Sequence, residues 1–370
     1  MPNLRIPDHL LPGDGRFGSG PSKVRAEAVA ALAGVGTSLL GTSHRRDPVR
    51  QLVHRVRDGL RELWALPDGY DIVLGNGGAS AFWDVAILCL IAERSQHLVF
   101  GEFGARFTAA VEAAPHLDEP DVVAAAPGTR PRAAGRSGVD LYALTQNETS
   151  TGVVLDLERP AGADPDALVA VDATSGAGGV PFDPRAVDAY YFAPQKAFGS
   201  EGGLWAAVLS PAAIERTRSL ASRWVPPSLD LRRAIEQAAL DQTVNTPSIS
   251  TLFLFAHQLD WLLAEGGMAF AGRRCGASAA ALYGWAEASG YARPFVEEPA
   301  ARSPVVGTVD FDESVPAGVV SAVLRANGVV DTEPYGKLGR NQVRIGMFPA
   351  VEPADVEALT ACIDWVVERL

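Results

Sequence analysis

Short apolar runs alternate with helix-like stretches between residues 70 and 210, and this alternation constrains the fold more than any other feature. The runs read YDIVLGN, QHLVFGEF, DLYALTQNE, ALVAVDATS, AYYFAPQ and LWAAVLS. Runs of this length and composition, separated by helices or tight connections, predict a mostly parallel sheet that is covered on both faces. The helices expected between or after them cover residues 81–92, 105–114 and 211–221. Such sheets bind ligands beyond the carboxyl ends of their strands.

The pattern changes after Pro247. A long helix is expected over residues 248–264, a break at EGG, and a second helix over 268–289. The strand-like VVGTVDF and NQVRIGMF then alternate with the helical AGVVSAVLRANG and PADVEALTACIDWVVERL, which predicts a smaller α+β domain. We therefore expect a large domain over residues 16–262 and a small one over 263–370 together with 1–15. GTRPRAAGRSG is expected to be an exposed loop.

Charge and cysteine usage narrow the class of protein. The net charge of −12 over 370 residues argues against binding nucleic acid or an acidic membrane, which requires a basic surface. Cys89, Cys275 and Cys362 show no CxxC spacing, as is typical of reduced thiols in a cytoplasmic protein. The longest apolar runs are too short and too charged to span a membrane, and the polar, proline-broken N-terminus does not resemble a signal peptide.

A lysine and an aspartate each end one of the apolar runs. Asp172 lies in LVAVDATSG and Lys196 in YYFAPQKAFG, so both are expected at the carboxyl edge of the sheet. An amine and a carboxylate at that edge suit pyridoxal phosphate, because the lysine forms a Schiff base and the carboxylate keeps the pyridine nitrogen protonated. A plain ion pair explains the two residues equally well.

Gly75 to Ser80, GNGGAS, follow a strand and open a helix. Glycines allow close approach of the backbone to an anion, and a helix N-terminus offers N–H donors. The stretch matches neither the dinucleotide fingerprint nor the P-loop. An ordinary strand-to-helix turn capped by Ser80 is the alternative.

Several cations and one aromatic ring are further candidates. His44 and Arg45 precede a basic helix, where they could bind a carboxylate or phosphate. Arg344 is embedded in an apolar strand, so either a substrate carboxylate or a structural salt bridge is expected to pair with it. Phe103 is expected either in the core, the usual place of a phenylalanine, or stacked on a cofactor ring, and VNTPSIST by itself is a helix-capping sequence.

These motifs together resemble the phosphoserine aminotransferases, a branch of the class V pyridoxal-phosphate-dependent aminotransferases. The resemblance extends over nearly the whole chain, through FGSGP, SHR, GNGGAS, NET, VDATSG, QKAFG, VNTPS and an arginine-bearing strand near the end. It implies a fold-type I transferase with a seven-stranded sheet in its large domain. Residues 126–140 have no counterpart in the family pattern, and their role stays open.

The resemblance also implies a role for each matching residue in holding pyridoxal 5′-phosphate. Lys196 would form the Schiff base and shuttle the proton, and Asp172 would pair with the pyridinium nitrogen. Phe103 would stack on the ring, where the family commonly has tryptophan. The remaining residues implied at the cofactor are Ala79, Ser80, Thr149 and Gln195, with Asn245 and Thr246 reaching the phosphate in a neighbouring subunit.

For substrates, the resemblance implies transfer of the amino group of L-glutamate to 3-phosphohydroxypyruvate, which gives O-phospho-L-serine in L-serine biosynthesis. Arg344 would bind the α-carboxylate. The distal phosphate or γ-carboxylate would be surrounded by Ser19, His44, Arg45 and Arg340. The subunit-crossing residues imply a homodimer with shared sites. The family also accepts a phosphorylated hydroxythreonine in pyridoxine biosynthesis.

Three other functions remain open from sequence. A serine– or alanine–glyoxylate aminotransferase would share the fold, but its substrates lack the distal anion that SHR would bind. A cysteine desulfurase needs a reactive cysteine on a mobile loop, whereas all three cysteines are expected in helices. A pyridoxal-phosphate-binding protein without catalysis would retain the lysine but not turn over substrate.

Overall fold

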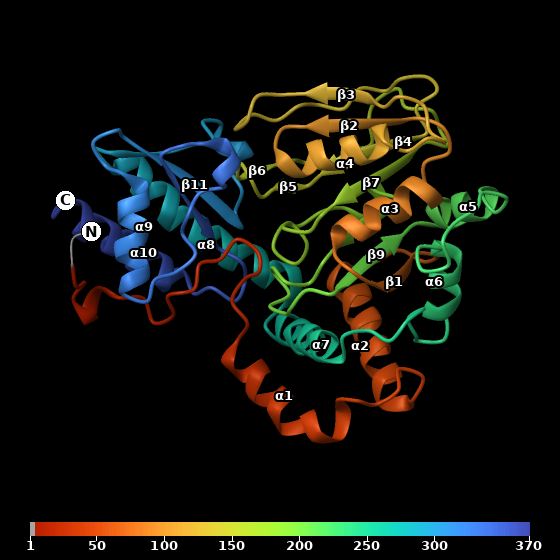
Figure 1. Ribbon diagram of the computed structural model, residues 1–370, viewed down its shortest axis with the longest axis horizontal. Coiled ribbons are helices and arrows are strands. Elements are labelled where there is room, and N and C mark those ends of the chain that lie inside the picture. The colour runs from red at the N-terminus through yellow and green to blue at the C-terminus, as the bar shows by residue number, and fades with distance from the viewer. Residues whose placement is uncertain (1–3) are drawn as a thin grey trace.

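A seven-stranded sheet forms the centre of the computed structural model, which describes residues 4–370 (Figure 1). Its strand order is β1-β9-β8-β7-β4-β2-β3, and only β9 runs antiparallel to its neighbours. The mostly parallel sheet expected from the apolar runs is thus confirmed. The strands are β1 (Asp71–Asn76), β2 (Ser95–Val99), β3 (Asp121–Ala124), β4 (Leu141–Thr145), β7 (Leu168–Asp172), β8 (Ala189–Phe192) and β9 (Leu204–Leu209).

Helices cover both faces of this sheet, as the unbroken apolar runs predict. On one face lie α3 (Ala79–Cys89), α4 (Glu102–Glu112), α5 (Pro211–Ser219) and α6 (Leu231–Ala238), and on the other lie α2 (Asp47–Leu63) and α7 (Ile249–Ala264). Successive strand residues face opposite sides, so that Tyr190 packs with α2 and α7 while Tyr191 packs with α3. Both tyrosines are fully buried.

A second, three-stranded antiparallel sheet lies beside the first. It consists of β10 (Ala292–Pro294), β11 (Val306–Phe311) and β12 (Gln342–Gly346), and its helices are α8 (Gly267–Ala288), α9 (Ala317–Ala326) and α10 (Pro353–Val367). The short elements are β5 (Asn147–Glu148), β6 (Val153–Val154), η1 (Asp8–Leu10), η2 (Pro184–Ala186), η3 (Pro299–Ala301) and η4 (Gly336–Leu338). The domain division near residue 262 stays a prediction.

The N-terminal segment joins the two sheets. Ile6 is buried in the core of the small sheet. Farther along, the amide of Phe17 donates to the carbonyl of Val330 (3.2 Å), and the amide of Gly346 donates to the carbonyl of Phe17 (2.8 Å). Ser22 then contacts the end of β8: its amide donates to the carbonyl of Gln195 (2.8 Å) and its hydroxyl donates to the carbonyl of Lys196 (2.6 Å).

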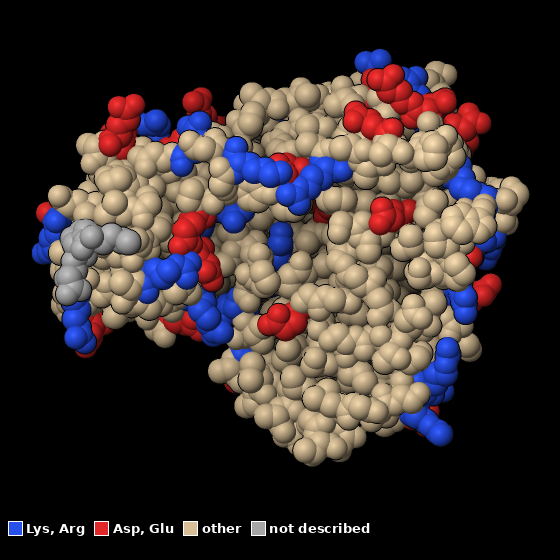
Figure 2. All heavy atoms as spheres, viewed as in Figure 1, with Lys and Arg blue, Asp and Glu red and all other residues tan. Residues whose placement is uncertain are grey.

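The surface divides by charge. On the face drawn in Figure 2, acidic and basic side chains are interspersed over the two sheets, whereas the part over α1 (Ala26–Leu39) is almost free of them. Exposed apolar side chains include Val29 in α1 and Leu40 directly after it. Within residues 4–370, no helix combines the length and the apolar character needed to cross a membrane.

Some elements have no clear sequence signal. The edge strand β3 has only four residues and follows a proline, and α6 is mostly polar, although the Asp230 side chain caps it by accepting from the amide of Arg232 (3.0 Å). The run QHLVFGEF ends as a strand at Val99, because Glu102 already begins α4. Three expected helices are confirmed with other bounds: 81–92 is found as Ala79–Cys89, 105–114 as Glu102–Glu112, and 211–221 as Pro211–Ser219.

Gly75 in β1 offers a test of the packing that supports the site. A Cβ at this position would lie 2.1 Å from Cζ2 of the Trp205 side chain, which is itself buried. Gly75→Ala is therefore expected to lower the free energy of unfolding by about 1–3 kcal/mol through overpacking. Gly276→Ala in α8, where nothing lies within 4 Å, is the control and is expected to stabilise by up to about 1 kcal/mol. Denaturant unfolding at one protein concentration measures both, and equal effects would contradict the packing argument.

Candidate active site

A cavity of about 290 Å³ opens at the carboxyl ends of the central strands. Its position agrees with the rule for parallel sheets, because β4, β7 and β8 all end at it. Seven residues predicted from the sequence line it: Ala79, Ser80, Phe103, Thr149, Asp172, Gln195 and Lys196.

Lys196 is buried at the wall of this cavity. Its ammonium donates a hydrogen bond to the Thr149 hydroxyl (2.9 Å). Burial lowers the pKa of Lys196 to about 8, while the nearby Asp172 carboxylate opposes that shift. A pKa so close to neutrality leaves a substantial neutral fraction of the amine, which is the form that attacks carbonyl groups.

Gly20 determines where the Lys196 side chain can lie. A Cβ on Gly20 would lie 2.4 Å from Cε of Lys196, and Gly20 has a φ of +136°, which L side chains rarely adopt. Sequence reasoning noted FGSGP without giving this glycine a role. The structure shows that the missing side chain makes room for the lysine.

Asp172 is held in one orientation by two donors. One carboxylate oxygen accepts from the Trp83 indole N–H (3.0 Å) and the other from the amide of Thr174 (3.0 Å). Trp83 was missed from sequence, because a tryptophan in the apolar AFWDVAILC resembles a core residue. Its N–H, which needs a partner when buried, was the only available signal.

The hydroxyl that accepts from Lys196 belongs to a small buried network. The Thr149 hydroxyl donates to the Ser175 hydroxyl (2.8 Å). The Ser175 hydroxyl also accepts from the side-chain amide of Asn147 (2.8 Å) and donates to the backbone carbonyl of Asn147 (2.7 Å). Because the Thr149 hydroxyl donates its proton to Ser175, its oxygen remains free to accept the hydrogen bond from Lys196. Ser175 was another residue that sequence reasoning did not single out.

The N-terminus of α3 points its free amides at the cavity. Gly78 precedes the helix without a side-chain cap, and Ala79 and Ser80 form its first turn. The first amides of a helix have no intrahelical partner, so an uncapped end carries unsatisfied donors and partial positive charge. The strand-to-helix turn of GNGGAS is confirmed, without the Ser80 cap.

These features fit pyridoxal phosphate. The cavity contains a primary amine with a lowered pKa, a fixed carboxylate, an aromatic ring at Phe103 and an uncapped helix N-terminus for a phosphate. The buried Oδ1 of Asn147 and Oε1 of Gln195 also lack hydrogen-bond partners among the described residues. Lys196 and Asp172 would hold the aldehyde and ring nitrogen, and the start of α3 would hold the phosphate.

Two predicted substrate residues lie next to the cavity. Ser19 precedes Gly20 in the chain and is buried, and its hydroxyl forms no hydrogen bond with any described residue. Arg344 donates to the carbonyl of Thr149 (3.2 Å), and its guanidinium carbon lies 5.4 Å from the centre of the Tyr335 ring. Burial lowers the pKa of Arg344 below its ordinary value, as expected for a guanidinium still available to an anion.

The other predicted residues do not line this cavity. Arg340 forms an ion pair with Asp310 and lies over the Phe295 ring at 4.4 Å. The remaining four form a separate cluster on the surface: His44 contacts the Thr246 hydroxyl (2.9 Å), Asn245 precedes Thr246, and Arg45 donates to the Gln242 side chain (2.6 Å).

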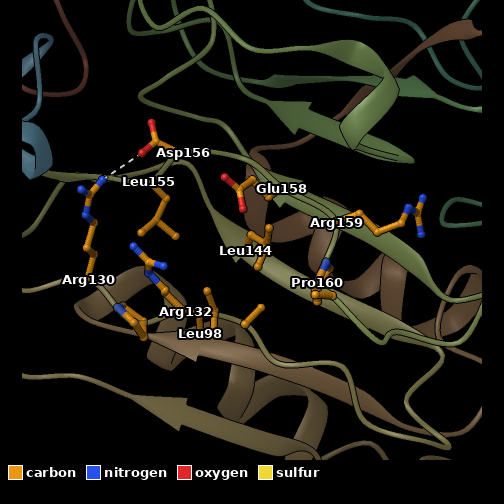
Figure 3. Close-up of a pocket in the computed structure, with 12 residues that line it drawn as sticks. Leu98, Arg130, Arg132, Leu144, Leu155, Asp156, Glu158, Arg159 and Pro160 are labelled. Carbon is orange, nitrogen blue, oxygen red and sulfur yellow. Dashed lines mark hydrogen bonds and ion pairs between the residues drawn. The ribbon is translucent and has the colours of Figure 1, made fainter.

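A second cavity, of about 310 Å³, has a lining that does not include Lys196 (Figure 3). Its apolar floor consists of Leu98, Leu144 and Leu155, and the loop expected from GTRPRAAGRSG forms one wall. Arg130 in that loop is paired with Asp156 (3.1 Å). No lysine lines this cavity, so the amine chemistry belongs to the first.

Comparison with known proteins agrees with this site. The Aminotransferase class-V family model matches residues 18–359. The phosphoserine aminotransferase of Nocardioides sp. is 59% identical over 370 residues, covering 99% of both chains. A phosphoserine aminotransferase structure from Cytophaga hutchinsonii has a TM-score of 0.87 at 23% identity, covering 95% of this chain and 99% of that one. An alanine–glyoxylate aminotransferase from Nostoc sp. has a TM-score of 0.78 at 22% identity, covering 99% and 97%.

The buried amine makes the stability of the cofactor-free protein depend on pH. Because the folded state lowers the pKa of Lys196 from 10.5 to about 8, the unfolded state binds more protons between these values, and stability rises with pH through that window. Lys196→Met removes this term. The variant is expected to gain on the wild type below pH 8, by at most about 3 kcal/mol, and to lose that gain towards pH 10. Denaturant unfolding at several pH values measures the difference, and a pH-independent difference would contradict the assignment.

Proposed function

The chain belongs to the class V aminotransferase family, and from that premise we infer that it acts as a phosphoserine aminotransferase. It transfers the amino group of L-glutamate to 3-phosphohydroxypyruvate, giving O-phospho-L-serine and 2-oxoglutarate, with pyridoxal phosphate as cofactor. The observation that carries this conclusion is the buried Lys196 beside Asp172 in a cavity at the strand ends, in a chain 59% identical to a phosphoserine aminotransferase. The likeness to an alanine–glyoxylate enzyme, at 22% identity, extends to the fold alone.

Lys196 and Asp172 divide the chemistry. When bound, pyridoxal phosphate supplies an aldehyde that condenses with amines and a ring that accepts electrons. The Nζ of Lys196 would carry a proton between the substrate Cα and the aldehyde carbon of the cofactor, which its lowered pKa favours near neutral pH. Asp172, held by Trp83, would bind the pyridine nitrogen, and Phe103 would pack against the ring.

Arg344 is proposed to bind the substrate α-carboxylate. Its backbone lies in β12, and its side chain reaches the carbonyl of Thr149, the residue that contacts Lys196. One of its donors, the buried Nε, has no partner among the described residues. A carboxylate in this position would be held beside the amine, with its Cα facing Nζ.

We propose a homodimer in which each site uses residues of the other subunit. His44, Arg45, Asn245 and Thr246 do not line their own cavity, and the contacts among them and Gln242 place them on one surface. Two exposed leucines lie close to this cluster in the sequence: Leu40 precedes His44 by four residues, and Leu240 precedes Gln242 by two. Exposed apolar side chains close to a group of polar residues are typical of a protein–protein interface.

The cytoplasmic location and the activity on a phosphorylated hydroxythreonine stay predictions, and the role of residues 126–140 stays open. The location was expected from reduced thiols, and Cys89, Cys275 and Cys362 are all buried and free. Retention of cofactor without turnover would instead support the binding-protein alternative.

The reaction is tested by following the absorbance of the bound cofactor during titration with amino acids. L-Glutamate and O-phospho-L-serine are expected to convert it rapidly to the amine form, and L-alanine only slowly, because alanine has no distal anion. Lys196→Ala is expected to lower conversion by roughly a thousandfold or more. Equal rates with alanine would leave a class V aminotransferase but overturn the phosphoserine assignment.

Sharing of sites is tested by mixing two inactive variants. Lys196→Ala and Arg45→Ala are each expected to lose phosphoserine turnover. Coexpressed, they form mixed dimers in which one site has an intact Lys196 and, from the other subunit, an intact Arg45, so about a quarter of wild-type activity is expected from random pairing. No recovery would place Arg45 at the site of its own chain or remove it from the site.

A further inference from the structure

Two cations and one carboxylate meet at the rim of the lysine cavity. Glu102, the first residue of α4, accepts from Nε of Arg106 one turn later (2.5 Å) and forms an ion pair with Lys337 in η4. The cluster therefore joins a helix of the large sheet to a segment that leads into β12 of the small sheet. In Figure 2, basic side chains with an acidic one between them lie beside a hollow, in the region where Figure 1 draws the start of α4.

Arg106 belongs to the cavity itself. It lines the cavity wall together with Phe103, which precedes it by three residues and so lies on the same face of α4. The guanidinium carbon of Arg106 lies 5.9 Å from the centre of the Phe103 ring, and Nζ of Lys196 lies 5.5 Å from the same centre. Both cations therefore lie within 6 Å of the centre of the same aromatic ring.

The cavity otherwise lacks a cation for the far end of a dianionic substrate. Within the described chain, the arginine and lysine that line it are Arg106 and Lys196, and Arg344 lies beside them. Lys196 is needed for amine chemistry, and Arg344 suits the α-carboxylate. Arg340, which was expected at the distal group, is engaged with Asp310.

We propose that Arg106 and Lys337 bind the distal phosphate of phosphoserine or the γ-carboxylate of glutamate, and that Glu102 occupies this position until the substrate displaces it. The proposal rests on the proposed function and adds to it a pair of specificity-determining residues from the same chain as Lys196. It is compatible with Arg45 reaching the same anion from the other subunit.

Charge balance explains how such an exchange would select substrates. One carboxylate between two cations leaves a net positive charge, so a phosphate dianion can replace Glu102 with a gain in attraction. A substrate without a distal anion leaves the ion pairs of Glu102 intact, so Arg106 and Lys337 add nothing to its binding free energy. Glu102 remains ionised at neutral pH, since Lys337, and then Arg106, hold its pKa below the ordinary value.

Tyr335 connects this cluster to the proposed α-carboxylate site. Its hydroxyl accepts from Arg106 (3.3 Å), and its ring lies 5.4 Å from the Arg344 guanidinium carbon. The two ends of a substrate would thus be bound on either side of one tyrosine. Because Arg106 contacts the hydroxyl of this tyrosine, a variant of Arg106 could act through Tyr335, and the test must separate the two effects.

The test compares O-phospho-L-serine with L-serine, which differs only by the phosphate, in single-turnover reactions of the holoenzyme. Arg106→Ala and Lys337→Ala are each expected to weaken apparent binding of phosphoserine about tenfold or more, with the limiting rate nearly unchanged and the reaction with L-serine within about twofold. Glu102→Gln, which keeps the shape but not the charge, is expected to tighten phosphoserine binding severalfold.

A binding measurement without turnover provides the second readout. Inorganic phosphate is expected to bind the holoenzyme in competition with phosphoserine, more tightly in Glu102→Gln and more weakly in Arg106→Ala, by the same factors. Arg218→Ala, which breaks an exposed ion pair with Glu215 in α5, is the matched control and is expected to change neither substrate. Tyr335→Phe removes the hydroxyl contact alone and is expected to preserve the preference for phosphoserine.

Two results would overturn the proposal. In one, Arg106→Ala binds phosphoserine and phosphate as the wild type does; in the other, it loses phosphoserine and L-serine activity equally. A wild-type protein that binds phosphate through Arg106 yet does not turn over phosphoserine would instead overturn the proposed function and leave the anion site standing.

Discussion

Desolvation of the Lys196 ammonium is the constraint on which the rest of the site depends. An amine at the end of a buried strand loses most of its hydration, and its proton is therefore held less firmly. The surroundings only partly stabilise the charged form: the Thr149 hydroxyl accepts one hydrogen bond from the ammonium, and Asp172 attracts the ammonium but also accepts from the Trp83 indole. The absence of a side chain at Gly20 completes the arrangement, because any larger residue would occupy the volume of the lysine chain.

Sheet topology brings these groups together from distant parts of the sequence. Asp172 and Lys196 follow neighbouring strands, β7 and β8, whose register pairs Asp172 with Tyr191. The start of α3 reaches the same edge from β1, on the other side of the antiparallel β9. A phosphate site, a carboxylate and an amine thus face one cavity because parallel strands end at the same edge.

Much of this could be predicted from sequence, and the reasons for the failures are physical. Strands buried on both faces leave continuous apolar runs, and a polar residue directly after such a run predicts the site edge, as Asp172 and Lys196 did. Contacts across the chain leave no such pattern. In the sequence Trp83 resembles a core residue, and only the structure shows that its N–H donates to Asp172. Likewise, the sequence does not indicate that Arg340 pairs with Asp310, a residue of β11. Residues such as Asn245, whose proposed role lies in another subunit, cannot be assigned from one chain.

The N-terminal segment makes part of the site depend on residues that are synthesised late. Residues 17–22 contact the carbonyls of Gln195 and Lys196, and they are themselves held by Val330 and by the amide of Gly346. Although the large sheet can assemble while the chain is still emerging from the ribosome, the contacts of this segment with Val330 and Gly346 form only after those residues have been synthesised. A nascent chain stalled before β12 would therefore contain the amine and the carboxylate, while residues 17–22 would still lack one of the contacts that hold them beside the lysine.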